Sequence, residues 1–358
     1  MTGATENSAT AQATSAHLVV RPARAGDLEG LHRLALAAGS GMTNMPPDRA
    51  ILGPRLEASE QAFASEAARA AGSAMFFMVT RPATDLDEEA IVGSVAIFPR
   101  IGVEWPFYSY RLTRQAQTYR AMNKTVAHDL LILANDFDGA AEVGGLFVDP
   151  SARGSAAGRL AARSRYMFLA EHRDWFGRQV ISELRGYQDE TGRSPFWDAL
   201  GREFYDMEFE EADRLNSQTG NQFIADLAPK HPIYANLLAK AARDAIGQPH
   251  RDGRRALELL REEGFRYEGY IDIFDGGPTL FADIDDIKTV RDQRRARVTA
   301  LDDAPRGETR LVSCGHGPGF RCARGHTADD GADGVRLHAP LARALNVKVG
   351  DWVRHVAF

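Results

Sequence analysis

The chain has 358 residues, of which 44% are hydrophobic, and it carries a formal net charge of −6 at pH 7. This length is enough for two domains or for one domain with an appendage, and the hydrophobic share is typical of a soluble globular protein. The acidic balance argues against a general nucleic-acid-binding protein, and no apolar run is long enough to cross a bilayer.

The N-terminal part of the chain predicts a tail, followed by strands and helices. Residues 1–16 are rich in Thr, Ser and Ala and have no apolar core, so we expect a disordered tail that is not a signal peptide. Gly26-Asp27 is expected to cap the first helix, and the Gly/Pro-rich residues 39–47 predict a loop. The predicted elements are a strand over 17–23, a helix to about Ala38, one or two helices over 48–71, and hairpin strands over 75–80 and 91–98.

Further strands are predicted before the middle of the chain. The aromatic-rich segment 103–111 predicts one strand, and the apolar run 130–134 predicts another. An Asp-Gly turn over 135–139 then leads into a strand over 140–148. Together these elements indicate an α+β fold with a mixed, mostly antiparallel sheet.

Residues 145–160 combine the end of a strand, a loop of small residues and the start of a helix. Asp149-Pro150 breaks the strand, residues 153–158 are small or basic, and apolar residues then recur at helical spacing. In this geometry backbone N–H groups converge, the helix dipole favours negative charge, and small side chains admit a pyrophosphate. A plain helix start is the alternative interpretation of the same residues.

The pattern Arg153-x-x-Ala156-x-Gly158 resembles the coenzyme-A pyrophosphate loop of the GNAT N-acyltransferases. That family usually has glycine at the position of Ala156, and alanine is tolerated there if its φ angle is negative. The resemblance implies that acyl-CoA is bound by the strand end and the loop, namely by Leu146, Phe147, Val148, Arg153, Gly154, Ser155, Ala156, Ala157 and Gly158.

The second half of the chain predicts a closing unit and then a β-rich tail. The predicted elements are a splayed strand over 179–185, a short helix over 194–201, a closing strand over 204–209, and helices over 234–246 and 255–263. The polar residues 301–309 predict a linker. We therefore expect a tail over 1–16, a GNAT-like acyltransferase domain over 17–300 and a small β-rich C-terminal domain over 301–358.

Cysteine usage indicates a reducing cytoplasm. The two cysteines, Cys314 and Cys322, fit no zinc pattern and provide no disulfide framework. His316 and His326 lie nearby in the sequence, so a metal site is an alternative, although we expect no metal.

Several motifs, in their order and spacing, resemble the arginine N-succinyltransferases. They are Asn135-Asp136, Leu146-Phe-Val-Asp-Pro150, Ser164-Arg-Tyr-Met-Phe168, Ser194-Pro-Phe-Trp197, Pro229-Lys-His-Pro-Ile-Tyr234 and Tyr270-Ile-Asp-Ile-Phe-Asp-Gly-Gly-Pro278. The resemblance runs from about Leu18 to the C-terminus. It implies an acyltransferase that moves the succinyl group of succinyl-CoA to the α-amine of L-arginine, giving N2-succinyl-L-arginine and CoA in arginine catabolism. It also implies an oligomer of identical chains or one formed with a similar subunit.

Amine acylation determines which proton-transfer groups to look for. The reacting amine must be neutral, whereas a protonated α-amine has a pKa near ~8, so the site needs a proton acceptor and a proton donor for the departing thiolate. His231, held extended by the proline after it, is the best candidate, and a loop histidine bonded to backbone is the alternative. The resemblance implies that His231 donates or accepts the proton, and that acyl-CoA is contacted at Ala127 or His128. A backbone N–H near Leu146 or Phe147 is expected to meet the oxyanion.

Charged side chains are the candidates for holding the two substrates. A guanidinium favours a planar carboxylate partner. The candidates, each of which could instead be a solvated or structural charge, are Asp136, Asp138, Glu142, Glu183 and Asp275. Arg111 and Arg185 are candidates for the succinyl carboxylate. Two other classes of function stay open: a GNAT enzyme for another amine, such as ornithine, or another acyl-CoA, and a non-catalytic partner subunit or arginine-sensing module.

Overall fold

The computed structural model describes residues 17–39, 45–83, 88–219 and 222–358, so the expected tail and most of the 39–47 loop lie outside it. The strands are β1 Val19–Pro22, β2 Met75–Arg81, β3 Ala90–Phe98, β4 Ser109–Tyr119, β5 Lys124–Ala134, β6 Ala141–Val148, β7 Gln179–Glu183, β8 Ile233–Tyr234, β9 Arg266–Ile271, β10 Pro278–Asp283, β11 Arg294–Asp302, β12 Glu308–Cys314, β13 Arg321–Asp329, β14 Gly334–His338 and β15 Trp352–Ala357. The helices are α1 Leu28–Ala38, α2 Arg49–Ala64, α3 Glu66–Ala70, α4 Ala157–Glu171, α5 Arg202–Tyr205, α6 Phe209–Thr219, α7 Gln222–Leu227, α8 Lys240–Ala245, α9 Arg254–Glu262, α10 Lys288–Asp292 and α11 Ala339–Leu345. No described helix is long and apolar enough to cross a membrane.

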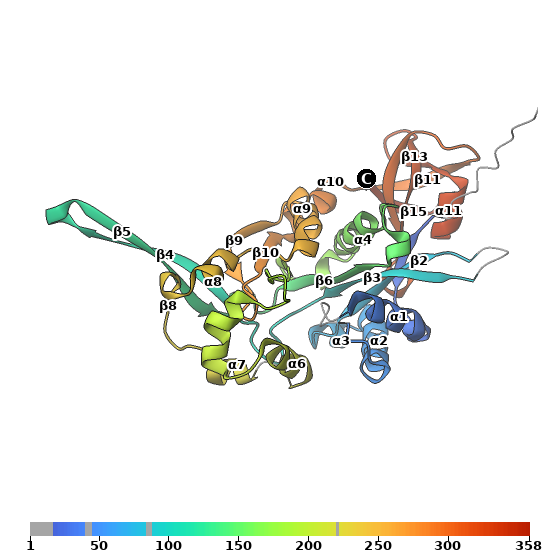
Figure 1. Cartoon of the computed structure of the whole chain (residues 1–358). Coiled ribbons are helices and arrows are strands. Elements are labelled where there is room, and N and C mark those ends of the chain that lie inside the picture. The colour runs from blue at the N-terminus through green and yellow to red at the C-terminus, as the bar shows by residue number, and fades with distance from the viewer. Residues whose placement is uncertain (1–16, 40–44, 84–87, 220–221) are drawn as a thin grey trace, which may run out of the picture.

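The described strands form one continuous sheet in the order β12-β15-β11-β14-β13-β1-β2-β3-β6-β7-β10-β9-β4-β5-β8. Two described pairs, β6–β7 and β11–β14, are parallel, and the others are antiparallel. The expected α+β fold with a mixed, mostly antiparallel sheet is therefore confirmed. At the C-terminal end, β12 pairs with both β15 and β13, so these strands close into a small barrel that joins the main sheet through β1 (Figure 1).

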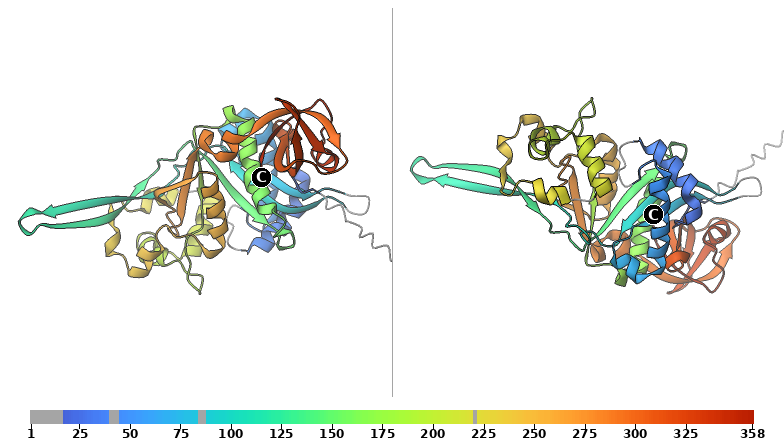
Figure 2. Two further views of the ribbon diagram at one scale, coloured as in Figure 1. Left: turned by 90° about the horizontal axis from the view of Figure 1, so that it is seen from above. Right: turned by 90° about the horizontal axis from the view of Figure 1, so that it is seen from below.

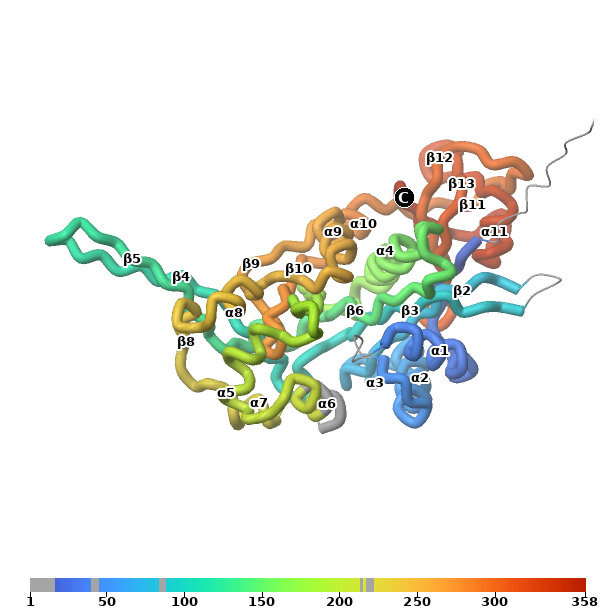
Figure 3. The backbone as a smooth tube through the Cα atoms, in the orientation of Figure 1, coloured from blue at the N-terminus to red at the C-terminus, as the bar shows by residue number. Residues whose placement is uncertain are grey.

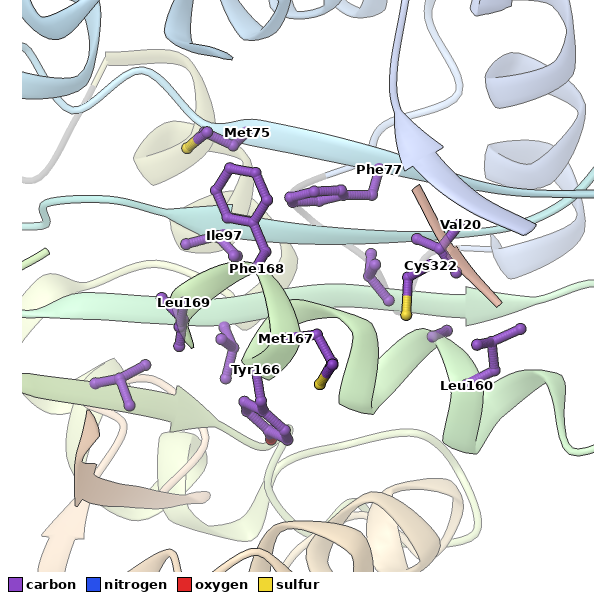
Figure 4. Close-up of a cluster of buried hydrophobic side chains, with 14 of the residues drawn as sticks. Val20, Met75, Phe77, Ile97, Leu160, Tyr166, Met167, Phe168, Leu169 and Cys322 are labelled. Carbon is purple, nitrogen blue, oxygen red and sulfur yellow. The ribbon is translucent and has the colours of Figure 1, made fainter. Parts of the chain in front are cut away.

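Alternation along β2 divides the first part of the sheet into two packed faces. Phe76 and Met78 pack against α1 and α2, whereas Met75 and Phe77 point to the opposite face, where α4 lies (Figure 2). Figure 4 shows this second face, with Phe168 of α4 among side chains of the neighbouring strands. The Phe77 and Phe168 rings meet edge to face, with centroids 5.0 Å apart. Because α4 packs against the sheet, the barrel and α10, it is buried along nearly its whole length.

The second part of the sheet, β7-β10-β9-β4-β5-β8, holds its own apolar cluster. Tyr110 of β4 and Ile271 of β9 pack there against Phe196 and Trp197. Beyond this cluster β4 and β5 continue as a long two-stranded hairpin that projects from the body of the molecule (Figure 3). On one side of the hairpin, β9 pairs with β4 only at Tyr110 and Arg111. On the other side, β8 pairs with β5 only at Leu130 and Leu131. Most of the hairpin therefore has no neighbouring strand among the described residues.

The sequence interpretation was wrong about where this hairpin begins. Residues 101–105 form bends, and β4 starts at Ser109 instead of residue 103. Phe107 belongs to a loop fixed by its own N–H, which donates to the Asp138 carboxylate at 2.7 Å. The partner strand β5 starts at Lys124 instead of residue 130, because backbone pairing with β4 extends through residues that are polar on both faces.

Three other expectations in the second half were wrong in whole or in part. Residues 204–209 are not a strand, because Tyr205 ends α5 and stacks on Trp197 with ring centroids 5.5 Å apart, and Phe209 begins α6. The helix expected over 234–246 is shorter, since Tyr234 pairs with β5 and α8 begins at Lys240. The linker expected over 301–309 is shorter, because β11 ends at Asp302 and β12 begins at Glu308, which leaves residues 303–307 as the connection. The division into domains at 300/301 stays a prediction, although β11 starts at Arg294 and pairs with β14 and β15.

One expectation made from a single residue also changed, and the surroundings of the cysteines and their neighbouring histidines can now be described. Asp27 occupies the N-cap position of α1, but its carboxylate accepts from the Arg24 N–H and binds both Arg21 amino groups, each at 2.8 Å. Cys314 and Cys322 are free thiols. His316 packs on His172 and His326 lies near His17, so the two histidines are in different places, and no group of three metal-ligating side chains occurs among the described residues.

Candidate active site

A cavity of about 320 Å³ lies where β6 and β7 separate. These parallel strands pair at Ala141–Val180 and Glu142–Ile181, and beyond those residues they diverge. The cavity is lined by β6, α4, β7, α9 and the turn after β9, with Phe209 of α6 at its edge. The expected splayed strands are therefore present, and the space between them is open to a substrate.

A β-bulge shapes the β6 wall of this cavity. Ser94 and Ala96 of β3 pair with Phe147 and Gly144, so β6 contains one extra residue. Gly145 takes a φ of 59°, which suits glycine, and its carbonyl accepts the Ser94 hydroxyl at 3.2 Å. The extra residue of a bulge leaves the regular pairing of the ladder. The bulge therefore makes this part of β6 a suitable place for backbone to face an acyl group.

The structure separates the three residues expected at the strand end. Leu146 lines the cavity. Phe147 packs on the other face of the sheet with the α1–α2 cluster, and Val148 is buried in the α4 cluster. Alternation along a strand explains the separation, because neighbouring residues point to opposite faces.

The expected anion loop lies at the N-terminus of α4. Arg153, Gly154 and Ser155 are exposed, and a Cβ added to Gly154 or Gly158 would meet nothing within 4 Å. The 15-residue helix α4 begins at Ala157, so its free N–H groups and the positive end of its dipole face this loop. Ala162, Arg165 and Tyr166 of the same helix line the cavity. One helix thus runs from the candidate anion loop to the cavity.

The negative φ angle that would make alanine tolerable at position 156 is not observed, because Ala156 has a φ of +63° and a ψ of 12°. Ala156 is therefore in the left-handed region, which costs a non-glycine residue roughly 1–2 kcal/mol. The chain keeps this conformation without glycine, since Ala156 directly precedes α4 and its carbonyl accepts the Leu160 N–H at 2.9 Å.

Four carboxylates line one side of the cavity: Glu142, Glu183, Asp272 and Asp275. Asp275 accepts the backbone N–H groups of Gly186 and Gly277 at 2.7 and 2.8 Å, and Asp272 accepts those of Phe274 and Asp275 at 2.8 Å. These two aspartates therefore fix the turn after β9. Their carboxylates are already used by the protein itself.

The two glutamates have fewer partners. Glu183 accepts the Thr279 hydroxyl at 3.2 Å, and Glu142 has no hydrogen bond or ion pair among the described residues. Burial raises the pKa of Glu142 to about 7, even though the charge of Arg165 opposes the shift. Burial, followed by the neighbouring carboxylates, raises the pKa of Glu183 well above its usual range. A substrate cation would relieve both effects.

Two arginines line the same cavity. Arg185 is exposed and donates to Gln188 at 2.7 Å, whereas Arg165 is buried. The other candidate cation, Arg111, lies outside the cavity, where it pairs with Asp136 at 3.5 Å and covers the Tyr270 ring. Asp136 and Asp138 line a different hollow, so neither reaches the candidate site.

The remaining predicted residues gather at the base of the hairpin. His231 is exposed in the turn before β8, which pairs with β5 at Leu130 and Leu131. The His128 ring meets the Tyr234 ring edge to face, with centroids 5.7 Å apart, and Ala127 is exposed beside it. None of Ala127, His128 and His231 lines the cavity. Their roles stay predictions.

The sequence interpretation missed Arg165 and Asp272, although both lie in motifs that it quoted. The position of Arg165 carried a signal, because it follows Ala161 by four residues and precedes Phe168 by three, on the apolar face of the helix. Asp272 stands between two isoleucines and directly follows β9, which places it at a strand end.

Comparison with known proteins places this geometry in context. Residues 18–289 match the family model described as arginine N-succinyltransferase beta subunit, and residues 294–357 match the C-terminal domain of that subunit. The arginine N-succinyltransferase of Yersinia pestis (strain Pestoides F) is 37% identical over 347 residues, covering 94% of this chain and 97% of the relative. That of Enterobacter sp. (strain 638) is 38% identical over 341 residues, covering 95% and 97%. The solved structure of arginine/ornithine succinyltransferase subunit AI from Pseudomonas aeruginosa is 33% identical, with a TM-score of 0.84 over 96% of this chain and 99% of that one.

Proposed function

This chain belongs to the arginine N-succinyltransferase family, and from that premise we propose that it transfers the succinyl group of succinyl-CoA to the α-amine of L-arginine. The products are N2-succinyl-L-arginine and CoA. The observation that carries the proposal is that α4 lines an acidic cavity with Ala162, Arg165 and Tyr166 and begins, at Ala157, directly after the candidate anion loop. That combination suits a cationic acceptor and a pyrophosphate-bearing donor.

Succinyl-CoA is the proposed co-substrate, bound along the loop before α4. Its pyrophosphate would lie against residues 153–158, of which Arg153, Gly154 and Ser155 are exposed, where backbone N–H groups and the helix dipole favour an anion. Its acyl group would then enter between the diverging strands, with the thioester carbonyl at the Gly145 bulge. There a backbone N–H near Leu146 would stabilise the oxyanion.

L-arginine is the proposed acceptor, with its guanidinium at Glu142 and Glu183. A guanidinium presents planar N–H donors that match carboxylates in pairs. Binding it would give an ion pair to the two cavity glutamates, which form none among the described residues. Asp272 and Asp275 would contribute through their charge, since their oxygens hold the turn.

The reaction requires one proton to leave the amine and one to reach the sulfur. The neutral amine attacks the thioester carbonyl carbon, forming a C–N bond and an oxyanion, after which the C–S bond breaks and thiolate departs. We propose His231 as the group that accepts or donates the proton. His231 is exposed, so its imidazole is accessible to a substrate.

A coenzyme-A release assay tests the proposal. The purified chain is given succinyl-CoA or acetyl-CoA with L-arginine, L-ornithine or L-lysine, and kcat/KM is measured for each pair. We expect the highest value for succinyl-CoA with arginine. Ornithine is the second candidate acceptor, because the solved relative is named for both amino acids. Arginine binding without CoA release from either donor would instead identify a sensing or partner subunit.

We also propose that the enzyme assembles through the β4–β5 hairpin. An isolated two-stranded hairpin is marginally stable in water. This one exposes Tyr119 and Met122 by 62% and 69%, which a second, similar subunit would cover. Such an assembly would also allow His231 at the hairpin base to approach the cavity of the second subunit. The free thiols of Cys314 and Cys322 fit the reducing cytoplasm in which we propose that the enzyme acts.

A further inference from the structure

Arg165 is a buried cation on the cavity face of α4. Arg165 is only 4% exposed, yet it lines the cavity together with Ala162 and Tyr166. Its Nη1 donates to the Gly144 carbonyl at 3.1 Å, and its Nε donates to the Ala162 carbonyl at 3.3 Å. These two bonds fix the guanidinium between the helix and the β6 bulge.

Among the described residues no carboxylate forms a direct ion pair with this guanidinium, although Glu142 lines the same cavity and acts on it through its charge. Arg163, two residues earlier and almost as buried, shows the ordinary solution: it pairs with Glu263 at 2.9 Å and donates to Thr289 at 2.9 Å. Arg165 instead bonds to two uncharged carbonyls, and its Nη2 has no partner in the described chain. Buried charges are normally paired, because an unpaired one loses its hydration without compensation. An anion entering the cavity would supply the missing partner.

We propose that Arg165 binds the free carboxylate of a substrate in this cavity. The inference rests on the proposed function, in which both substrates carry such a group. One is the terminal carboxylate of the succinyl chain, and the other is the α-carboxylate of arginine. A guanidinium can bind either with two parallel N–H···O bonds.

The fixed position of Arg165 fits this role. Its bond to Gly144 places the guanidinium beside the bulge where the acyl carbonyl is proposed to lie. In a succinyl group the carboxylate carbon lies roughly 4 Å from the thioester carbon, from standard bond lengths. The amine that attacks the thioester carbonyl must also come close to the β6 bulge. In arginine the α-carboxylate is bonded to the same carbon as that amine, so it too would lie near Arg165. Arg165 therefore discriminates substrates with a free carboxylate from those without one.

The test uses Arg165→Gln and Arg165→Lys with two donors and two acceptors. The donors are succinyl-CoA and acetyl-CoA, and the acceptors are L-arginine and agmatine, which lacks the α-carboxylate. Loss of a charge-assisted pair is expected to lower kcat/KM by ~10- to 100-fold for the substrate whose carboxylate is bound. The analogue without that carboxylate should lose little, and Arg165→Lys should fall between the wild type and Arg165→Gln.

The pattern of losses identifies the source of the carboxylate. A loss seen with succinyl-CoA but not acetyl-CoA assigns the succinyl group, whereas a loss seen with arginine but not agmatine assigns the amino acid. Equal losses for all four combinations would make Arg165 a structural residue and overturn the proposal. Arg185→Gln is the comparison variant, because Arg185 is the other arginine that lines the cavity and is itself a candidate for the succinyl carboxylate. A shift in selectivity for Arg185→Gln and none for Arg165→Gln would also overturn the proposal.

A binding measurement separates this inference from the proposed function. Calorimetry compares CoA, acetyl-CoA, succinyl-CoA, arginine and agmatine as ligands of the wild type and of both Arg165 variants, whose melting temperatures are measured in parallel. If the wild type transfers no succinyl group to arginine, the proposed function fails. The proposal for Arg165 still stands or falls on whether its removal erases the affinity gained from a ligand carboxylate.

Discussion

His172 accepts a hydrogen bond from the backbone N–H of Gly317 at 2.8 Å, through Nε2. Its other ring nitrogen, Nδ1, donates to the Phe168 carbonyl at 3.0 Å, which fixes the neutral tautomer. The histidine therefore ties the end of α4 to the turn between β12 and β13 of the C-terminal barrel. A proton on Nε2 would remove the acceptor and break this contact.

Stability is expected to fall on acidification because of His172. Burial lowers the pKa of His172 from 6.5 to about 4, so between these values the unfolded chain binds a proton that the folded chain does not. The contribution of His172 is fully present above pH 6.5 and is lost as the pH falls towards 4, by up to about 3 kcal/mol. Urea unfolding at pH 7, 5.5 and 4.5 measures it. His172→Gln does not titrate, so its free energy of unfolding should vary less with pH; equal slopes would contradict the assignment.

Ala156→Gly is expected to stabilise the fold. The left-handed conformation costs alanine roughly 1–2 kcal/mol, which glycine avoids. Glycine in turn lowers the stability by about 0.4–1 kcal/mol, because its unfolded chain has more conformational freedom. The free energy of unfolding should therefore rise by up to about 1 kcal/mol in a denaturant titration. Gly154→Ala is the matched opposite change, at a φ of 83°, and should destabilise. Destabilisation by Ala156→Gly would show that the methyl group makes a contact worth more than the backbone cost.

Gly158→Asp is expected to weaken acyl-CoA binding without unfolding the chain. A Cβ at Gly158 meets nothing within 4 Å, so the side chain fits. The helix dipole stabilises a carboxylate near the start of α4, so the fold should not lose stability. Against a pyrophosphate the same charge is repelled, so the KM for acyl-CoA should rise at least about tenfold. Gly158→Asn, which has the same shape without the charge, should change KM much less. An unchanged KM in a cooperatively melting Gly158→Asp protein would remove this loop from donor binding.

His231→Ala is expected to lower kcat by ~100- to 10,000-fold, the usual range for a general acid or base. The exposed position of His231 means that the melting temperature should not change. The pH–rate profile should change shape, because the proposed proton-transfer group is absent. His250→Ala controls for removal of another imidazole. A loss confined to the KM for arginine would make His231 a binding residue, and wild-type kcat would assign proton transfer elsewhere.

Replacing Tyr119 and Met122 together by serine is expected to weaken subunit assembly. Each removes a large exposed side chain from the projecting hairpin, and burying one such side chain is worth roughly 1.5–3 kcal/mol. Analytical ultracentrifugation should show a dissociation constant raised at least about tenfold. Thr125→Ser on the same hairpin keeps the apolar surface and should not change it. A wild-type protein that sediments as a monomer at micromolar concentration would exclude this role.

Local patterns in the sequence predicted the parts of the site that are local in structure. The strand over 140–148, the loop over 153–158 and the helix after it were predicted correctly because residues within a few turns of one another determine them. The hairpin beyond Ser109 was mostly missed, since polar residues on both faces give no alternation to detect. The sequence assigned Tyr205 to a strand, but the Tyr205 ring stacks on Trp197, and this tertiary contact overrides the local preference for a strand. Such a contact is not visible in the sequence.

The cavity could be predicted only in part, because distant segments build it. Glu142 and Glu183 were candidates among five carboxylates. Only the pairing of β6 with β7 brings them close, and the divergence of the two strands beyond that pairing opens the cavity. Asp136 looked equivalent in the sequence, yet its strand end faces another hollow. Arg165 lies on an apolar helix face, where its charge looked like an exception to the pattern instead of part of a site.

The position of β1 has a consequence for synthesis on the ribosome. This strand, at the start of the described chain, pairs with β2 on one edge and with β13 on the other, through Val19–Ala323 and Val20–Cys322. The second edge must wait until nearly the whole polypeptide has been translated. During that interval β1 presents unpaired N–H and C=O groups that invite pairing with other nascent chains. A premature stop before β13 would leave that edge permanently open, so such fragments should be insoluble instead of merely inactive.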